Sequence, residues 1–169
     1  MTPDESRIKA ERPPRLDLTG IDTVIFDKDG TLIDFHAMWG GWARQLGDLP
    51  SLFRRLRADG RRLAVITNDE RAPTDATLRA LGIRESVEAM VCGDDGFAVK
   101  PAPDAVIAVC HAFRTEPSRV AVVGDTPADV AMAHEAGAGL VVGVRSGIGT
   151  DDDLATADVV VDSVDGLLD

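Results

Sequence analysis

The stretch that decides the fold runs over residues 23–31 and reads TVIFDKDGT. Its first four residues are β-branched or aromatic and uninterrupted by charge, which predicts a short strand buried on both faces. Two aspartates on alternate positions, Asp27 and Asp29, follow this strand directly, and Gly30 then allows the backbone to turn sharply. The stretch therefore predicts a buried strand that ends in an acidic, tightly turning exit.

The same strand pattern returns along the chain. Further short apolar runs, LAVIT, EAMVC, VAVVG and GLVVGV, occupy residues 63–67, 88–92, 120–124 and 139–144. Amphipathic patterns that predict helices lie between them, at residues 50–59, 74–81, 104–113 and 127–136, and glycine follows several of these. Apolar strands that alternate with helices predict an α/β fold, a doubly wound, Rossmann-like parallel sheet. We also expect Asp151–Asp153 to cap a late helix.

Length and composition favour one domain. A chain of 169 residues can bury a single substantial core. Residues 1–17 are polar and proline-rich, which predicts a loosely packed N-terminal arm ahead of a single core domain at residues 18–169. The sequence begins with no apolar leader and holds no run long enough to span a bilayer, so we expect a cytoplasmic protein with no membrane partner.

The charge of the chain argues against nucleic acid as a partner. Eighteen basic and 29 acidic side chains give a net charge of −11, which repels phosphate backbones and anionic membranes. The only basic cluster, at residues 54–62, precedes the second strand and is interpreted as a solvated helix face. Cys92 and Cys110 lie in apolar surroundings and are expected to be buried thiols.

Three further polar groups follow predicted strands or loops. Thr67 and Asn68 end the second strand, Lys100 stands alone in an acidic stretch, and Asp125 and Asp129 belong to the run GDTPAD at residues 124–129. Each has an ordinary structural explanation: a polar strand end, a surface lysine, and a helix N-cap that complements the helix dipole.

Their combined position makes a stronger case. The carboxyl ends of parallel strands meet at one edge of the sheet, where α/β folds bind their ligands. Several carboxylates gathered there repel one another unless a divalent cation neutralises them. Mg²⁺ is the expected cofactor, because it accepts two or three carboxylates together with water and a phosphate oxygen.

Four motifs occur in a fixed order along the chain: DxDGT, an apolar strand that ends in Thr, a single Lys, and GDTxxD. This order resembles the four motifs of the haloacid dehalogenase-like hydrolase superfamily, and in particular its phosphoglycolate phosphatase-like members. The resemblance covers about residues 21–168. It implies a Mg²⁺-dependent phosphatase that hydrolyses a phosphate monoester. Asp27 is then the nucleophile that forms an aspartyl phosphate, and Asp29 is the general acid that protonates the departing alcohol and later activates water.

The resemblance also assigns the binding residues. Thr67 and Asn68, with the turn amides near Gly30, hold the transferring phosphoryl group, while Lys100 balances charge and keeps Asp27 ionised. The Mg²⁺ site combines Asp27, the main-chain carbonyl of Asp29, Asp125 and Asp129. Whether Asp129 binds the metal directly or through water is left open.

The spacing of the motifs leaves no room for a cap domain. Thr67 follows Asp27 by 40 residues and Lys100 follows Thr67 by 33, and both intervals are filled by expected helices and strands. We therefore expect a member of the superfamily without a cap. Its phosphorylated substrate is a small molecule or a macromolecule, and the resemblance to phosphoglycolate phosphatases does not identify it. Aromatic residues at helical spacing in 35–46 form either a helix packed on the sheet or an exposed patch that grips substrate or pairs with another subunit.

Two other classes of function stay open at this point. A catalytically weak binding or scaffold protein could keep all four motifs. A phosphoacceptor signalling domain also joins aspartate, threonine, lysine and Mg²⁺ on a doubly wound sheet, although the order Asp27, Thr67, Lys100, Asp125 differs from the order in such domains.

Overall fold

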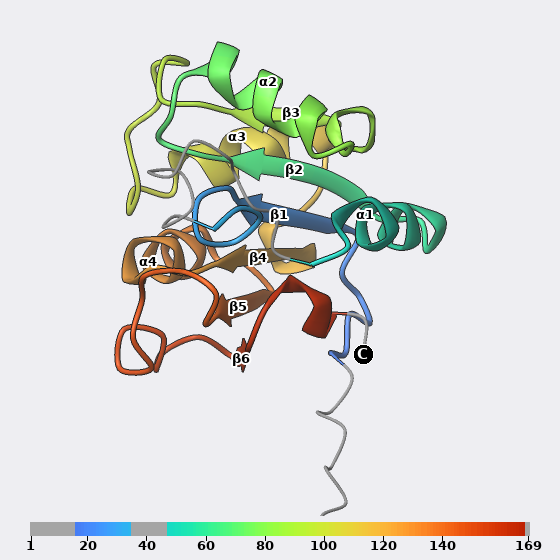
Figure 1. The fold of residues 1–169 in the computed structure, drawn as a ribbon. Helices are drawn as coiled ribbons and strands as arrows, with labels where there is room; N and C mark the ends of the chain where they lie inside the picture. The colour runs from blue at the N-terminus through green and yellow to red at the C-terminus, as the bar shows by residue number, and fades with distance from the viewer. Residues whose placement is uncertain (1–15, 35–46, 168–169) are drawn as a thin grey trace, which may run out of the picture.

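The computed structural model describes residues 16–34 and 47–167, in which helices cover both faces of a parallel six-stranded sheet (Figure 1). The strands lie in the order β3-β2-β1-β4-β5-β6, so the first strand occupies the middle of the sheet. Their bounds are β1 Thr23–Asp27, β2 Arg62–Ile66, β3 Ala89–Val91, β4 Val120–Gly124, β5 Leu140–Val144 and β6 Val159–Val161. The predicted doubly wound α/β class is confirmed.

Within the described residues, four α-helices connect the strands, each ten residues long. They are α1 Leu49–Ala58, α2 Arg71–Ala80, α3 Asp104–Phe113 and α4 Pro127–Ala136. The backbone amide of Ser51 donates to the carboxylate of Asp48 at 3.2 Å, which satisfies one of the free amides at the start of α1. Helix α2 begins three residues before the predicted Thr74, because Pro73 fits the first turn of a helix.

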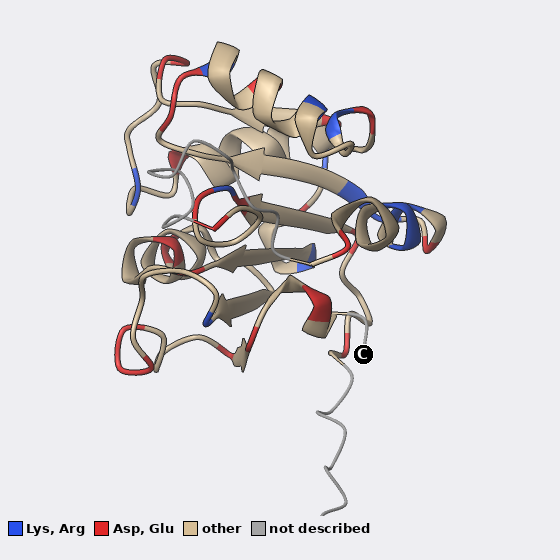
Figure 2. Ribbon diagram, viewed as in Figure 1, with Lys and Arg blue, Asp and Glu red and all other residues tan. Residues whose placement is uncertain are grey.

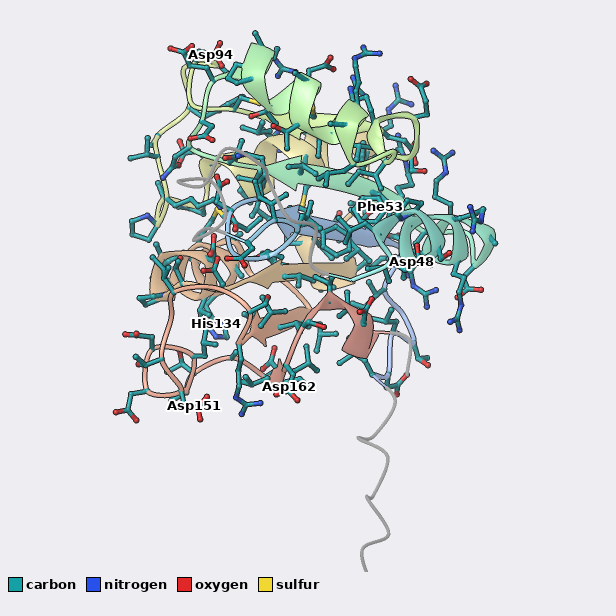
Figure 3. The ribbon with its side chains drawn as sticks, viewed as in Figure 1. Asp48, Phe53, Asp94, His134, Asp151 and Asp162 are labelled. Atoms are coloured by element: carbon teal, nitrogen blue, oxygen red, sulfur yellow. The ribbon has the colours of Figure 1, made fainter. Side chains whose placement is uncertain are left out.

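Alternation along β1 divides the core into two layers. Val24 and Phe26 pack with α1 on one face of the sheet, and Ile25 packs with α3 and α4 on the other. The rings of Phe26 and Phe53 stack with centroids 4.8 Å apart. Phe53 lies between α1 and the sheet (Figure 3) and is completely buried. Because both faces are covered, the interiors of the strands are mostly apolar, as their sequences predicted.

The prediction that Asp151–Asp153 cap a late helix is wrong. These residues form turns, in which the carboxylate of Asp153 accepts hydrogen bonds from the amide and hydroxyl of Thr150 at 2.9 and 2.8 Å. The chain then forms β6, which pairs in parallel with β5 at the edge of the sheet. Three consecutive valines at 159–161 favour a strand, and β-propensity outweighs the acidic cap signal here.

Charge is distributed as the sequence predicted. Arg54, Arg55 and Arg57 lie on the exposed surface of α1, next to the amino-terminal end of β2. Figure 2 shows this basic surface on the opposite side from the acidic turn that follows β1. The arginines therefore lie away from the carboxyl ends of the strands.

Several predictions fall on residues that the structure does not describe. The N-terminal arm lies almost wholly in 1–15, and the aromatic segment occupies 35–46, so the arm and the proposed subunit contact stay predictions. In the described parts of the intervals between Asp27 and Lys100, the chain forms only turns, helices and strands of the layers above. Among the described residues, no helix has the length and apolarity needed to cross a bilayer.

Phe53→Ala should lower the free energy of unfolding by about 3–5 kcal/mol, because it removes a fully buried ring and leaves a cavity against Phe26. Urea unfolding followed by circular dichroism measures this change. Phe97→Ala is the matched control, since that ring is 44% exposed, and it should cost less than about 1 kcal/mol. Equal losses in the two variants would contradict the packing described here.

Candidate active site

Three strand ends bring the predicted side chains to one edge of the sheet. Asp27 is the last residue of β1, Thr67 follows β2, and Asp125 follows β4. The parallel register pairs Asp27 with Ile66, and β4 lies on the other side of β1. Sequence positions almost one hundred residues apart thereby become neighbours.

A pocket of about 200 Å³ opens at this edge. It is lined by Asp27, Asp29, Thr67, Asn68, Asp69, Lys100, Asp125, Thr126, Ala128, Asp129 and Ile148. Every predicted site residue is in this lining except Gly30, which forms the turn beneath it. Asp69, Thr126, Ala128 and Ile148 were not predicted from the sequence.

Three carboxylates form a group that could hold a metal ion. Asp27, Asp125 and Asp129 each offer one oxygen, and these oxygens all lie within 4.8 Å of one another. Oδ2 of Asp27 is buried and has no hydrogen-bond partner, which is costly for a carboxylate oxygen. The donor set is all oxygen and includes the carboxylate with the orphaned atom, so the residues fit a hard divalent cation such as Mg²⁺.

The hydrogen bonds distinguish the roles of these carboxylates. Both oxygens of Asp129 are engaged: Oδ1 accepts from Lys100 at 2.7 Å, and Oδ2 accepts from the amide and hydroxyl of Thr126 at 3.1 and 2.7 Å. Asp125 Oδ2 accepts from the amide of Ile148 at 3.0 Å, and its Oδ1 receives only a long contact of 3.4 Å from Thr31. Asp27 and Asp125 therefore have more free lone pairs than Asp129.

Asp29 is predicted as both an acid and a metal ligand, and its side chain lies apart from this group. Its Oδ1 accepts a hydrogen bond from Lys28 at 2.7 Å, and the same ammonium pairs with Asp69 at 2.8 Å. Burial raises the pKa of Asp29 and outweighs the opposing effect of Lys28. The side chain is thus placed to hold a proton, and only its main-chain carbonyl remains as a candidate metal ligand.

Lys100 joins two of the clustered carboxylates. Its side chain is 6% exposed, and its ammonium donates to Asp27 and to Asp129. Burial opposes the charge, but the two carboxylates outweigh burial and raise the pKa of Lys100. The lysine is therefore a permanent cation in the site.

The charge of Lys100 favours the ionised form of Asp27, and burial opposes it. Burial raises the pKa of Asp27 to about 8; Lys100 acts against this rise, and the charge of Asp129 adds to it. The three carboxylates carry more negative charge than one ammonium balances. Full ionisation near neutral pH requires more positive charge than these side chains supply.

Two glycines permit the close packing around Asp125. Gly30 has φ +86°, and a Cβ there would lie 2.3 Å from Asp125 Oδ2. A Cβ at Gly147 would lie 1.8 Å from the same oxygen. The loop after β5 therefore packs directly on the carboxylate, and the amide of Ile148 donates to it from there. Gly147 and Ile148 were missed because nothing in their local sequence points to Asp125.

The chain has clear relatives among known proteins. A family model described as haloacid dehalogenase-like hydrolase matches residues 42–137. A phosphoglycolate phosphatase of Cupriavidus necator is 31% identical over 164 residues, which cover 94% of this chain and 66% of that protein. An N-acetylmuramic acid 6-phosphate phosphatase of Pseudomonas aeruginosa is 30% identical over 130 residues, which cover 75% of this chain and 57% of that protein. The chain thus spans less than two thirds of the length of each of these two relatives.

Solved structures share the fold at lower identity. The crystal structure of a predicted phosphoglycolate phosphatase from Haemophilus somnus matches with a TM-score of 0.77 and 20% identity, covering 88% of this chain and 96% of that one. CbbY from Rhodobacter sphaeroides, in complex with phosphate, matches with a TM-score of 0.75 and 19% identity, covering 87% and 99%. At this identity the likeness concerns the fold.

The family match, the order of the motifs and the fold agree. The chain belongs to the haloacid dehalogenase-like hydrolase family.

Asp27→Asn should stabilise the metal-free protein at pH 8. The folded state raises the pKa of Asp27 to about 8, so the folded carboxyl holds a proton that the unfolded chain releases above pH ~4. This difference costs stability as pH rises from about 4 to 8, and a neutral amide avoids the cost. We expect a gain of about 1–3 kcal/mol at pH 8, or several degrees in Tm, and a smaller gain at pH 5.

Thermal unfolding in a chelator at both pH values measures this gain. Asp162→Asn is the control, because that carboxylate is 94% exposed and is not among the residues that line the pocket. Adding Mg²⁺ should raise the Tm of the wild type more than that of Asp27→Asn. A lower Tm for Asp27→Asn at pH 8 would contradict the charge imbalance inferred here.

Proposed function

We propose that this chain is a Mg²⁺-dependent phosphatase that hydrolyses a phosphate monoester through an aspartyl phosphate on Asp27. The observation that carries the proposal is the carboxylate of Asp27, which lines a pocket beside a lysine and two further carboxylates and whose buried Oδ2 has no hydrogen-bond partner. A nucleophilic carboxylate needs a free lone pair, and this one has it.

In the first half of the reaction, one carboxylate oxygen of Asp27 attacks phosphorus and the bond to the alcohol oxygen breaks. Asp29 gives its proton to that oxygen, so the alcohol leaves neutral and Asp29 becomes an anion. Lys100, Thr67 and Asn68, which line the pocket, bind the transferring phosphoryl group. The hydroxyl of Thr67 also accepts from the amide of Asp69 at 3.2 Å, which fixes the turn that carries Asn68.

In the second half, water gives a proton to Asp29 and attacks phosphorus. The bond from phosphorus to Asp27 breaks, and inorganic phosphate and free Asp27 result. Asp29 thus alternates between acid and base, which fits a carboxyl whose pKa burial has raised.

Mg²⁺, when bound, would neutralise charge on the phosphoryl oxygens and lower the cost of ionised Asp27. Asp27, Asp125 and the main-chain carbonyl of Asp29 would hold it. Asp129, whose two oxygens are already engaged, would support the site through Lys100 and Thr126.

The relatives indicate a broad class of substrate. The compounds in their names, phosphoglycolate and N-acetylmuramic acid 6-phosphate, are different molecules, and both are phosphate monoesters. We propose a phosphorylated substrate of this class, turned over by residues 18–169 as one capless catalytic domain. We also propose a cytoplasmic location, which the free, buried thiols of Cys92 and Cys110 support.

The purified chain should hydrolyse an aryl phosphate in Mg²⁺, and removal of the metal should lower kcat/KM at least about 100-fold. Asp27→Asn should lower it at least about 1,000-fold, because it removes the nucleophile. Asp162→Asn, an exposed aspartate outside the pocket, is the matched control and should keep full activity. Phosphate release and acid-quench trapping of a phosphorylated chain measure these steps.

The same assays separate the other two functions. A phosphoacceptor domain would take up label on Asp27 without steady release of phosphate. A binding or scaffold protein would do neither. Either result would replace the proposal.

A further inference from the structure

Lys28 is a buried cation that the reaction above does not use. It lies between the two aspartates of DKDGT, and its side chain is only 3% exposed. Its ammonium is 2.7 Å from Oδ1 of Asp29 and 2.8 Å from Oδ2 of Asp69. Asp29 and Asp69 line the pocket, but Lys28 does not, so Lys28 can reach a substrate only through these carboxylates.

The two lysines of the site form separate pairs of contacts. Lys100 joins Asp27 to Asp129, and Lys28 joins Asp29 to Asp69. A buried ammonium is costly unless hydrogen bonds and opposite charges surround it. Lys28 has two carboxylate partners at short distance, Asp29 and Asp69, and these two contacts fix the position of its ammonium.

The contacts also fix Asp29. This carboxyl stands on the turn after β1, and a free carboxyl there could rotate about its side-chain bonds. With Oδ1 held by Lys28, the remaining oxygen, Oδ2, is the one that can carry the transferred proton. Because Asp69 lies on the loop after β2, it ties this arrangement to a second strand end.

We propose that Lys28, anchored by Asp69, is a positioning residue that orients the carboxyl of Asp29 for proton transfer to the leaving oxygen. The inference rests on the proposed phosphatase function. As the bond from phosphorus to the alcohol breaks, the proton moves from Asp29 Oδ2 to the alcohol oxygen, and the ammonium of Lys28 stabilises the carboxylate that is left. Water restores the proton in the second half of the reaction, so Lys28 itself gains and loses nothing.

The leaving group provides the test. An alkyl phosphate needs a proton on its departing oxygen, whereas dinitrophenyl phosphate releases a stable anion that needs none. Lys28→Met should lower kcat/KM for glycerol phosphate about 10- to 100-fold, with the loss in kcat rather than KM. It should change kcat/KM for dinitrophenyl phosphate less than about threefold. A normal rate on the activated ester also shows that the variant is folded.

Asp69→Asn tests the same network without disturbing a buried side chain, since Asp69 is 49% exposed. It should show the same selective loss on glycerol phosphate, to a smaller degree. In an Asp29→Asn background, Lys28→Met should cause no further loss on that ester, because residues that act through one group are not additive. Arg79→Met removes a cation from an exposed ion pair with Asp75 and should leave both rates unchanged.

Equal losses on both esters, or no loss on either, for Lys28→Met and Asp69→Asn would overturn the positioning role and leave the phosphatase proposal intact. A further loss on adding Lys28→Met to Asp29→Asn would overturn it as well. If the wild type hydrolyses neither ester, the phosphatase proposal fails, and this inference fails with it.

Discussion

Repulsion among desolvated carboxylates is the constraint on which the site depends. The parallel register brings Asp27, Asp125 and Asp129 together at the end of β1 and β4, where their side chains are largely buried. One ammonium, Lys100, offsets part of this charge and leaves the pKa of Asp27 near 8. The fold tolerates the arrangement because the strands beneath it are apolar on both faces. A protein selected only for stability would not gather acids there, which is the physical reason to read the cluster as functional.

The fold was predictable because its signals are local and repeated. Short β-branched runs alternate with helical patterns, and this alone predicts a parallel sheet with its ligands at the carboxyl ends. The error fell at the chain's end, where Asp151–Asp153 resembled a helix cap and the three valines of β6 were not counted as a strand. An edge strand of three residues shows little periodicity in its sequence, and its pairing with β5 depends on tertiary structure that the sequence does not reveal.

The site was predictable where a residue type and its place in a motif both carry information. Asp27, Lys100 and Asp125 lie where their motifs indicated. Asp69 and Ile148 could not be found this way, because only the folded chain brings them to the site. Asp69 pairs with Lys28, and the amide of Ile148 donates a hydrogen bond to Asp125. Lys28 stood inside the quoted motif without a role, since sequence alone does not tell which way a side chain turns.

Asp129 links the start of a helix to the charge of the pocket. It closes the capping box of α4 with Thr126 through one oxygen and holds Lys100 with the other. Fraying of the first turn of α4 would therefore remove one of the two carboxylates that hold Lys100, so a local opening of the backbone and a change in electrostatic balance become a single event. Hydrogen exchange at the amides of that turn would then report on the readiness of a site several residues away.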